Sequence, residues 1–174
     1  EMTEGILREA MDYYGKDYTE KTISINIRSQ MSSLAKNFDT LYERTIAEAQ
    51  NLHVRCPKMV LGEVYMIPVK EYDASVMDKK KVHFIDKVGA VEKYIKSFNA
   101  INGRPNHDKD DYKYERVCLL LIDFNQKPAK IYSSNRELIN DGLLDENSNA
   151  SIEELSWGTF TENILSIYKT RFGT

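Results

Sequence analysis

The sequence lacks both the long apolar runs of a membrane protein and the cysteine pattern of a secreted one. No stretch approaches the roughly 20 apolar residues needed to span a bilayer, and the N-terminus does not have the charged, apolar and small-residue order of a signal peptide. The cysteines, Cys56 and Cys118, stand alone, without CxxC or Cys/His ligand spacing. We therefore expect a soluble, cytoplasmic protein with free thiols, no zinc site and no membrane association.

Signatures of nucleotide hydrolysis and of histidine catalysis are missing too. Gly62, Gly89 and Gly103 stand alone, so there is no glycine-rich phosphate loop, and a nucleotide-dependent enzyme is disfavoured. The histidines are far apart in the sequence and show neither metal-ligand spacing nor a Ser/His/Asp arrangement. The net charge of −3 does not decide about nucleic acid, because a basic groove can coexist with an acidic balance elsewhere.

What the sequence does contain is an alternation of helix and strand patterns. Its 174 residues, 41% of them hydrophobic, suit a single domain over residues 1–174. The charged stretch 71–87 is predicted to be an exposed segment that leaves the core and contains a short pair of β-strands. Periodicity predicts strands at residues 23–31, 59–69, 117–124 and 129–132, and helices at residues 3–14, 40–54, 88–101, 134–139 and 159–172. The alternation predicts an α/β fold with a mixed β-sheet flanked by helices.

The most informative stretch is 23–53, where a two-faced strand precedes a two-faced helix. Isoleucines take every second position at the start of the strand, the period of a strand with one packed face. Asn26, Arg28 and Gln30 lie between and beyond them and should project together. Thr40, with Glu43 three residues later, is typical of a capped helix start. The simplest interpretation of the polar face is a half-exposed strand that turns these side chains to water.

The same stretch carries a motif order found in a known enzyme family. The run INIRSQ at residues 25–30 is followed by KNFD at residues 36–39 and by Glu43-Arg44 before an alanine-rich helix. This order resembles the core of type II restriction endonucleases of the PD-(D/E)xK superfamily, in the group whose catalytic strand reads E-x-K-S-Q. The resemblance continues more weakly through LGEVYMIP at residues 61–68 and the strand that follows Glu115. It implies a restriction-endonuclease-like fold.

The resemblance also implies a function. Such enzymes cut double-stranded DNA at specific sites by Mg²⁺-dependent phosphodiester hydrolysis, and a homodimer is implied because palindromic sites are read with two-fold symmetry. By position, Asn26 stands where the family has its metal-binding Glu, and Arg28 where it has the Lys that activates water. An amide offers a cation only one neutral oxygen, and an arginine stays protonated and cannot act as a base. Whether the chain is an active enzyme is therefore left open.

Carried over residue by residue, the resemblance assigns three groups of positions. The catalytic positions are Asn26, Arg28, Gln30 and Glu43. The metal ligands are Asp17, Asn26 and Glu43, with Asp12 as an alternative to Asp17. The DNA contacts are Lys36, Asn37 and Arg44.

Several accounts of the departure at residues 26 and 28 remain. In the first, the protein is an active nuclease in which Glu43, Glu48 or Glu63 has taken the metal role. In the second, Asn26 disables a former Glu site. In the third, the domain binds DNA or protein without cutting. Glu1 precedes Met2, which fits a fragment, and in a fragment upstream residues would complete the site. A further hypothesis is an unrelated α/β binding protein; a structure without residues 23–31 and 59–69 side by side in a mixed sheet would establish it.

Overall fold

A four-stranded mixed sheet forms the centre of the protein. The computed structural model describes residue 11 and residues 13–88 and 90–173. The strand order is β1-β2-β5-β6, with bounds β1 Ile23–Ser29, β2 Val60–Pro68, β5 Arg116–Asp123 and β6 Lys130–Tyr132. Strands β1, β2 and β5 run parallel and β6 runs antiparallel to β5, so the predicted mixed sheet, with 23–31 beside 59–69, is confirmed.

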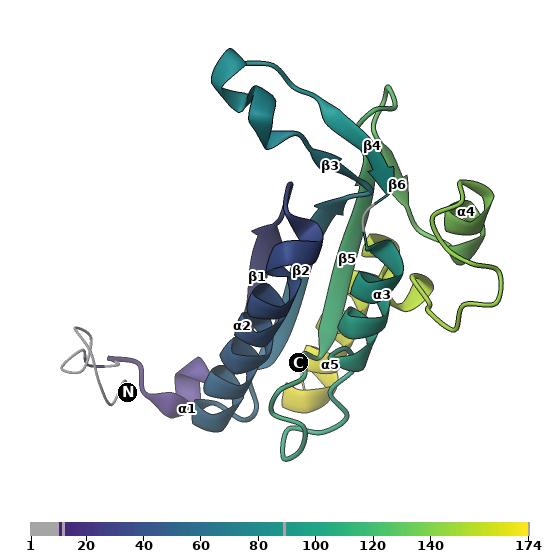
Figure 1. Cartoon of the computed structure of the whole chain (residues 1–174). Helices are drawn as coiled ribbons and strands as arrows, with labels where there is room; N and C mark the ends of the chain where they lie inside the picture. Colours follow the sequence, from purple (N-terminus) through teal and green to yellow (C-terminus); the bar gives the residue numbers. More distant parts are fainter. Residues whose placement is uncertain (1–10, 12, 89, 174) are drawn as a thin grey trace.

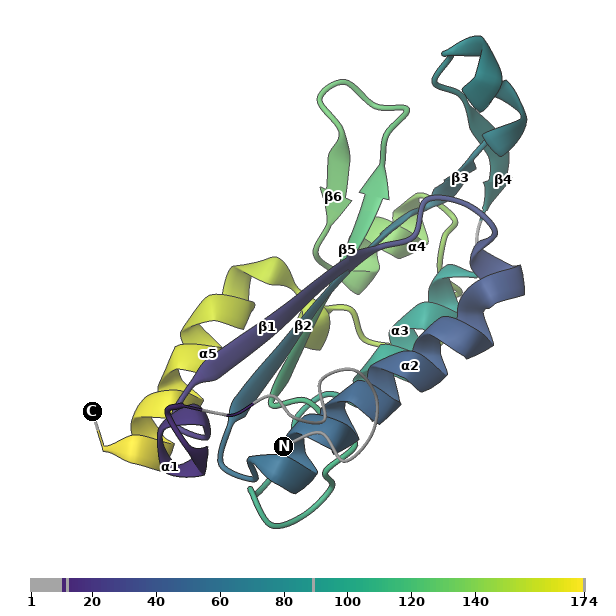
Figure 2. The same cartoon turned by 90° about the vertical axis from the view of Figure 1, so that its left-hand side faces the viewer.

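Helices cover both faces of this sheet (Figures 1 and 2). Helices α2 (Leu34–Arg55) and α3 (Val91–Ala100) lie on one face, and α5 (Trp157–Phe172) lies on the other. The short elements are α1 (Lys16–Thr19), α4 (Asn135–Asn140) and the 3-10 turns η1 (Ala74–Lys79) and η2 (Glu153–Leu155). The fold is thus the mixed α/β arrangement that the sequence predicts. No helix in the described ranges is long and apolar enough to cross a bilayer.

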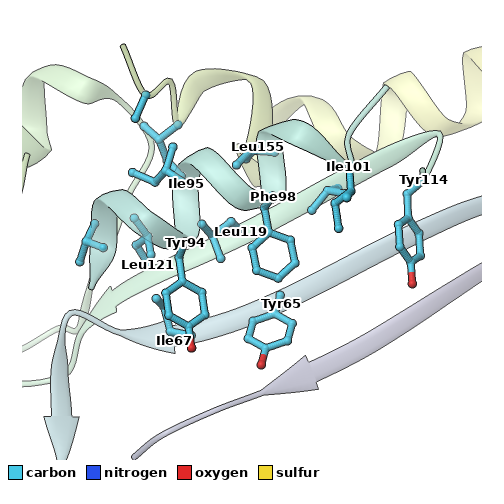
Figure 3. Close-up of a cluster of buried hydrophobic side chains, with 14 of the residues drawn as sticks. Tyr65, Ile67, Tyr94, Ile95, Phe98, Ile101, Tyr114, Leu119, Leu121 and Leu155 are labelled. Carbon is cyan, nitrogen blue, oxygen red and sulfur yellow. The ribbon is translucent and has the colours of Figure 1, made fainter. Parts of the chain in front are cut away.

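Aromatic side chains fill the larger core, between α2, α3 and the sheet. Tyr65, Tyr94 and Phe98 pack with ring centroids 4.9–6.2 Å apart, and Figure 3 shows them between α3 and the strands. The smaller core lies under α5, where Phe160 and Ile164 approach Gly62 so closely that a Cβ there would come within 2.8 Å of both side chains. Gly62 is therefore required for the close approach of α5 to β2.

Two hairpin arms rise from the carboxyl ends of the parallel strands (Figure 2). One continues directly from β2 and contains β3 (Lys70–Tyr72), η1 and β4 (Phe84–Val88), with β3 and β4 antiparallel. The other is the β5–β6 hairpin. Phe84 and Phe124 stack with their ring centroids 5.3 Å apart and join the two arms. The arms thus extend the sheet beyond the carboxyl ends of its parallel strands, where open α/β sheets commonly bind their ligands.

The structure corrects three expectations in the N-terminal part of the chain. Helix α2 begins at Leu34 rather than near Thr40, because Leu34 and Phe38 are already buried in the core. Residues 1–10 and 12 of the predicted helix 3–14 lie outside the described residues, and Met11, Tyr13 and Tyr14 are not helical. The isoleucine face of β1 is the less packed one, with Ile27 78% exposed, while Gln30, just beyond the strand on the polar side, is buried.

Candidate functional site

The guanidinium of Arg28 is the centre of a charged cluster at the edge of the sheet. Its Nη1 donates to Glu63 Oε1 at 2.9 Å and to Thr45 Oγ1 at 3.1 Å. Its Nη2 forms an ion pair with Glu48. The Arg28 side chain is 27% exposed and that of Glu48 is 41% exposed, whereas Glu63 has no exposed surface. The cluster therefore reaches from the core to the solvent.

Local structure explains why these residues meet. Asn26 and Arg28 share one face of β1, two residues apart, and Asn26 lies in register with Glu63 on the parallel strand β2. Thr45 and Glu48 lie three residues apart on one side of α2. The Thr45 hydroxyl donates to the carbonyl of Leu41 at 2.9 Å, so its oxygen is free to accept from Arg28. Side chains of β2 and α2 thus converge on a guanidinium that β1 provides.

Burial makes Glu63 an unusual carboxylate. Desolvation raises the pKa of Glu63 from 4.5 to about 7, although the nearby charge of Arg28 and the side chains of Asn26 and Tyr114 act to lower it. Its second oxygen, Oε2, is buried and has no hydrogen-bond partner with good geometry among the described residues. A pKa near neutrality is that of a group able to take up and release a proton under physiological conditions.

Tyr114, just before β5, completes the buried wall of the cluster. Its hydroxyl donates to the carbonyl of Thr45 at 2.9 Å. Burial first, and then the charge of Glu63, raise the pKa of Tyr114 to about 12, so it stays a neutral donor. In Figure 3 the Tyr114 hydroxyl points away from α3, as do those of Tyr65 and Tyr94.

Gln30 belongs to a different, structural network. Its side-chain oxygen accepts hydrogen bonds from Tyr94 at 2.7 Å and Tyr65 at 3.1 Å, and its amide donates to the carbonyl of Ser33 at 3.0 Å. Gln30 is buried. All of these groups belong to the turn before α2 and to the aromatic core, so Gln30 fixes the path of the chain between β1 and α2.

The structure does not bring the remaining predicted metal ligands to the cluster. Glu43 precedes Thr45 by two residues, which is about 200° around the helix, and its side chain is exposed on another side of α2. Asp17 is exposed on α1, which precedes the amino end of β1, and Asp12 lies outside the described residues. Glu48 and Glu63, which sequence reasoning held only as alternatives, are the carboxylates that converge on Arg28.

The predicted DNA contacts lie on the surface of α2. Lys36, Asn37 and Arg44 are all exposed. Lys36 and Asn37, on the first turn of α2, are close to the β3–β4 arm, because the amide of the preceding Ser33 donates to Glu71 of β3 at 2.8 Å. The surface around the start of α2 therefore adjoins the arms.

The residues of the cluster can be compared with the needs of a divalent cation. Mg²⁺ usually takes one or two protein carboxylates together with substrate phosphates and water. Glu48 and Glu63 supply two carboxylates, and the buried Oε2 of Glu63 lacks a partner in the described part of the chain. No group of three or more His, Cys, Asp and Glu side chains with metal-binding geometry occurs in the described ranges. Two carboxylates are the kind of donor that Mg²⁺ uses, and both are paired with the Arg28 guanidinium in this structure.

Thr45 and Tyr114 are the members of the cluster that sequence reasoning missed. Neither residue type signals a role by itself. The one sequence signal was Glu63, a carboxylate inside an otherwise apolar strand, which requires a buried partner. Comparisons with protein-family models, with curated proteins and with solved structures find no match to the chain.

Proposed function

We propose that this protein is a metal-dependent endonuclease of double-stranded DNA, with Glu63 and Glu48 as its metal-holding carboxylates. The observation that carries the proposal is the convergence of these two carboxylates on Arg28, beside Asn26, at the strand position where the resembling nucleases have their active site. Site-specific cleavage by a homodimer is the finer form of the same proposal and follows from the resemblance alone.

In this proposal each residue has one task. Glu63, Glu48 and the amide oxygen of Asn26 would hold Mg²⁺, which when bound supplies charge stabilisation at the scissile phosphate. Arg28 binds a phosphate oxygen, because a guanidinium is a strong donor to phosphate and cannot accept a proton. Tyr114 stays protonated and keeps the Thr45 region of α2 in place.

The two hairpin arms and the start of α2 supply the surface for the duplex. Lys79, Lys80 and Lys81 are exposed on the β3–β4 arm, and Lys127 is exposed on the β5–β6 arm. Lysines of this kind contact phosphates without reading sequence. Lys36 and Asn37, on the first turn of α2, extend the same surface towards the cluster.

The direct test is cleavage of plasmid and phage DNA with Mg²⁺ or Mn²⁺, with EDTA as the metal-free arm. The unmodified protein should give discrete fragments only with metal. Glu63→Gln and Glu48→Gln should each lower the rate at least about a hundredfold, because each removes several kcal/mol of charge stabilisation. Glu162→Gln, an exposed glutamate on α5, is the matched control and should cut normally.

Glu43→Gln separates the sequence-based assignment from the structural one. Glu43 is exposed on another side of α2, so its loss should leave cleavage unchanged. A rate that falls with Glu43→Gln and not with Glu63→Gln would contradict the assignment of Glu63 and Glu48.

A second candidate function is DNA binding without cleavage, and one observation favours it. Arg28 is already paired with both carboxylates, so a cation would have to displace its guanidinium from them. Retarded migration of duplex DNA with the unmodified protein, without cutting under any metal condition, would support this candidate. Cleavage that appears only in Asn26→Glu would mark a disabled enzyme.

A further inference from the structure

A polar hollow lies at the opposite end of the sheet from the arms. It has a volume of about 620 Å³, inside the roughly 300–1,000 Å³ range of small-molecule sites. The loop after α3, the start of β5 and the last turns of α5 line it, and they contribute Arg104, His107, Arg116 and Arg171. Three arginines in one hollow point to an anionic ligand.

Two of these arginines are paired with carboxylates: Glu115, which is buried, and Asp111, whose side chain is 40% exposed. Arg171 Nη1 lies 2.9 Å from Glu115 Oε1, and Arg104 Nη2 lies 2.6 Å from Asp111 Oδ1. Burial acts to raise the pKa of Glu115, but hydrogen bonds from His53 and from the Leu61 amide, with the charges of His53 and Arg171, hold it below its usual range. Glu115 is therefore ionised, and this network forms a rigid floor for the hollow.

Arg116 is different, because within the described ranges it has no ion pair. Its Nη1 donates to the backbone carbonyl of Glu115 at 3.0 Å, which orients the guanidinium but does not neutralise it. Three arginines thus share two carboxylates, and one positive charge is left over.

The other side of Arg116 faces a smaller hollow of about 350 Å³ lined by Glu153 and Glu154. Neither glutamate forms an ion pair with Arg116 in the described part of the chain. An anion is therefore favoured on the side of the larger hollow and opposed on the smaller one.

From this geometry we infer a binding site for a phosphate-bearing small molecule of mononucleotide size, with Arg116 as its principal cation. A guanidinium donates two parallel hydrogen bonds to a phosphate, and Arg116 is free to do so because Arg104 and Arg171, not Arg116, pair with Asp111 and Glu115. The site is separate from the Arg28 cluster, so the inference does not depend on the proposed nuclease function.

The test is calorimetric titration of the whole protein with inorganic phosphate, AMP and adenosine at fixed ionic strength. Phosphate and AMP should bind and adenosine should not. Arg116→Gln should weaken AMP binding about tenfold or more, because it removes the charged donor pair that holds the phosphate. Arg136→Gln, an exposed arginine on α4, is the matched control and should bind AMP normally.

Three results would overturn the inference: no phosphate or AMP binding by the unmodified protein, equal binding of AMP and adenosine, or unchanged AMP binding in Arg116→Gln. The melting temperature of Arg116→Gln, and its DNA binding by gel shift, show whether a loss of AMP binding is local. Because Arg116 lies far from the arms in the fold, both should match those of the unmodified protein.

Discussion

Arg28 on the edge strand β1 and Glu63 on the neighbouring strand β2 form a 2.9 Å ion pair whose carboxylate has no exposed surface. The pair joins the two strands on the face that α2 covers, and Glu48 and Thr45 extend it onto that helix. A buried pair contributes little net stability as a unit, but removal of one partner leaves a buried charge without compensation. The stability of this region therefore depends on both residues together.

Arg28→Met should destabilise the protein in a pH-dependent way. The loss should be largest at pH 8, up to about 3 kcal/mol, because the buried Glu63 must then either stay ionised without a partner or take up a proton from a solution that holds few. It should be smaller at pH 5, because Glu63 then takes up a proton and needs no partner. Urea unfolding at both pH values measures the difference. An equal loss at both would show that Arg28 acts by packing rather than by charge.

Glu63 should also give the unmodified protein a distinctive pH profile. Its pKa is raised to about 7 in the folded state, against 4.5 when solvated. Between these values the folded state holds a proton that the unfolded state has released, so the free energy of unfolding falls as the pH rises through this window. The difference corresponds to at most about 3 kcal/mol. Glu63→Gln cannot titrate, and its stability curve from pH 4.5 to 7.5 should lack this fall.

Sequence periodicity predicted the order of the main elements. Strands β1, β2, β5 and β6 and helices α3 and α5 form where apolar spacing places them. Helix α4 forms within one residue of the predicted range 134–139, with Ser134 and Glu137 as its capping box. Local signals failed at the start of α2. The Thr40 and Glu43 pattern was a plausible cap, but burial of Leu34 and Phe38 extends the helix by six residues towards the turn.

The partners of the candidate site could not be predicted, because they depend on how distant elements pack. That Asn26 and Arg28 share a face followed from their spacing on one strand. That Glu63 lies beside Asn26 is set by the register of two parallel strands, which no local pattern encodes. The exposed isoleucines have a similar cause: α5 packs against β2 at Gly62 and leaves Ile27 at the edge uncovered.

Gln30 should prove structural rather than catalytic. Gln30→Ala removes the acceptor of the Tyr65 and Tyr94 hydroxyls and leaves buried polar groups without partners, so we expect a loss of about 2–4 kcal/mol in the free energy of unfolding. DNA cleavage or binding, measured below the melting temperature of the variant, should remain within about threefold of the unmodified protein. A loss of activity in a fully folded Gln30→Ala protein would instead support the role that the family resemblance implies.

The arm lysines should determine the salt dependence of DNA binding. Each phosphate contact releases counterions and contributes about 0.9 to the slope of log K against log salt. Replacing Lys79, Lys80 and Lys81 with Gln should therefore reduce that slope by about 2–3 and weaken binding to unrelated sequences equally. The control replaces three exposed lysines near the amino ends of the strands: Lys16, Lys21 and Lys58. Both triple variants remove the same charge. A reduced slope in the arm variant alone would therefore show that the DNA duplex binds at the arms. Equal slopes in the two variants would mean that net charge, rather than the arms, governs binding.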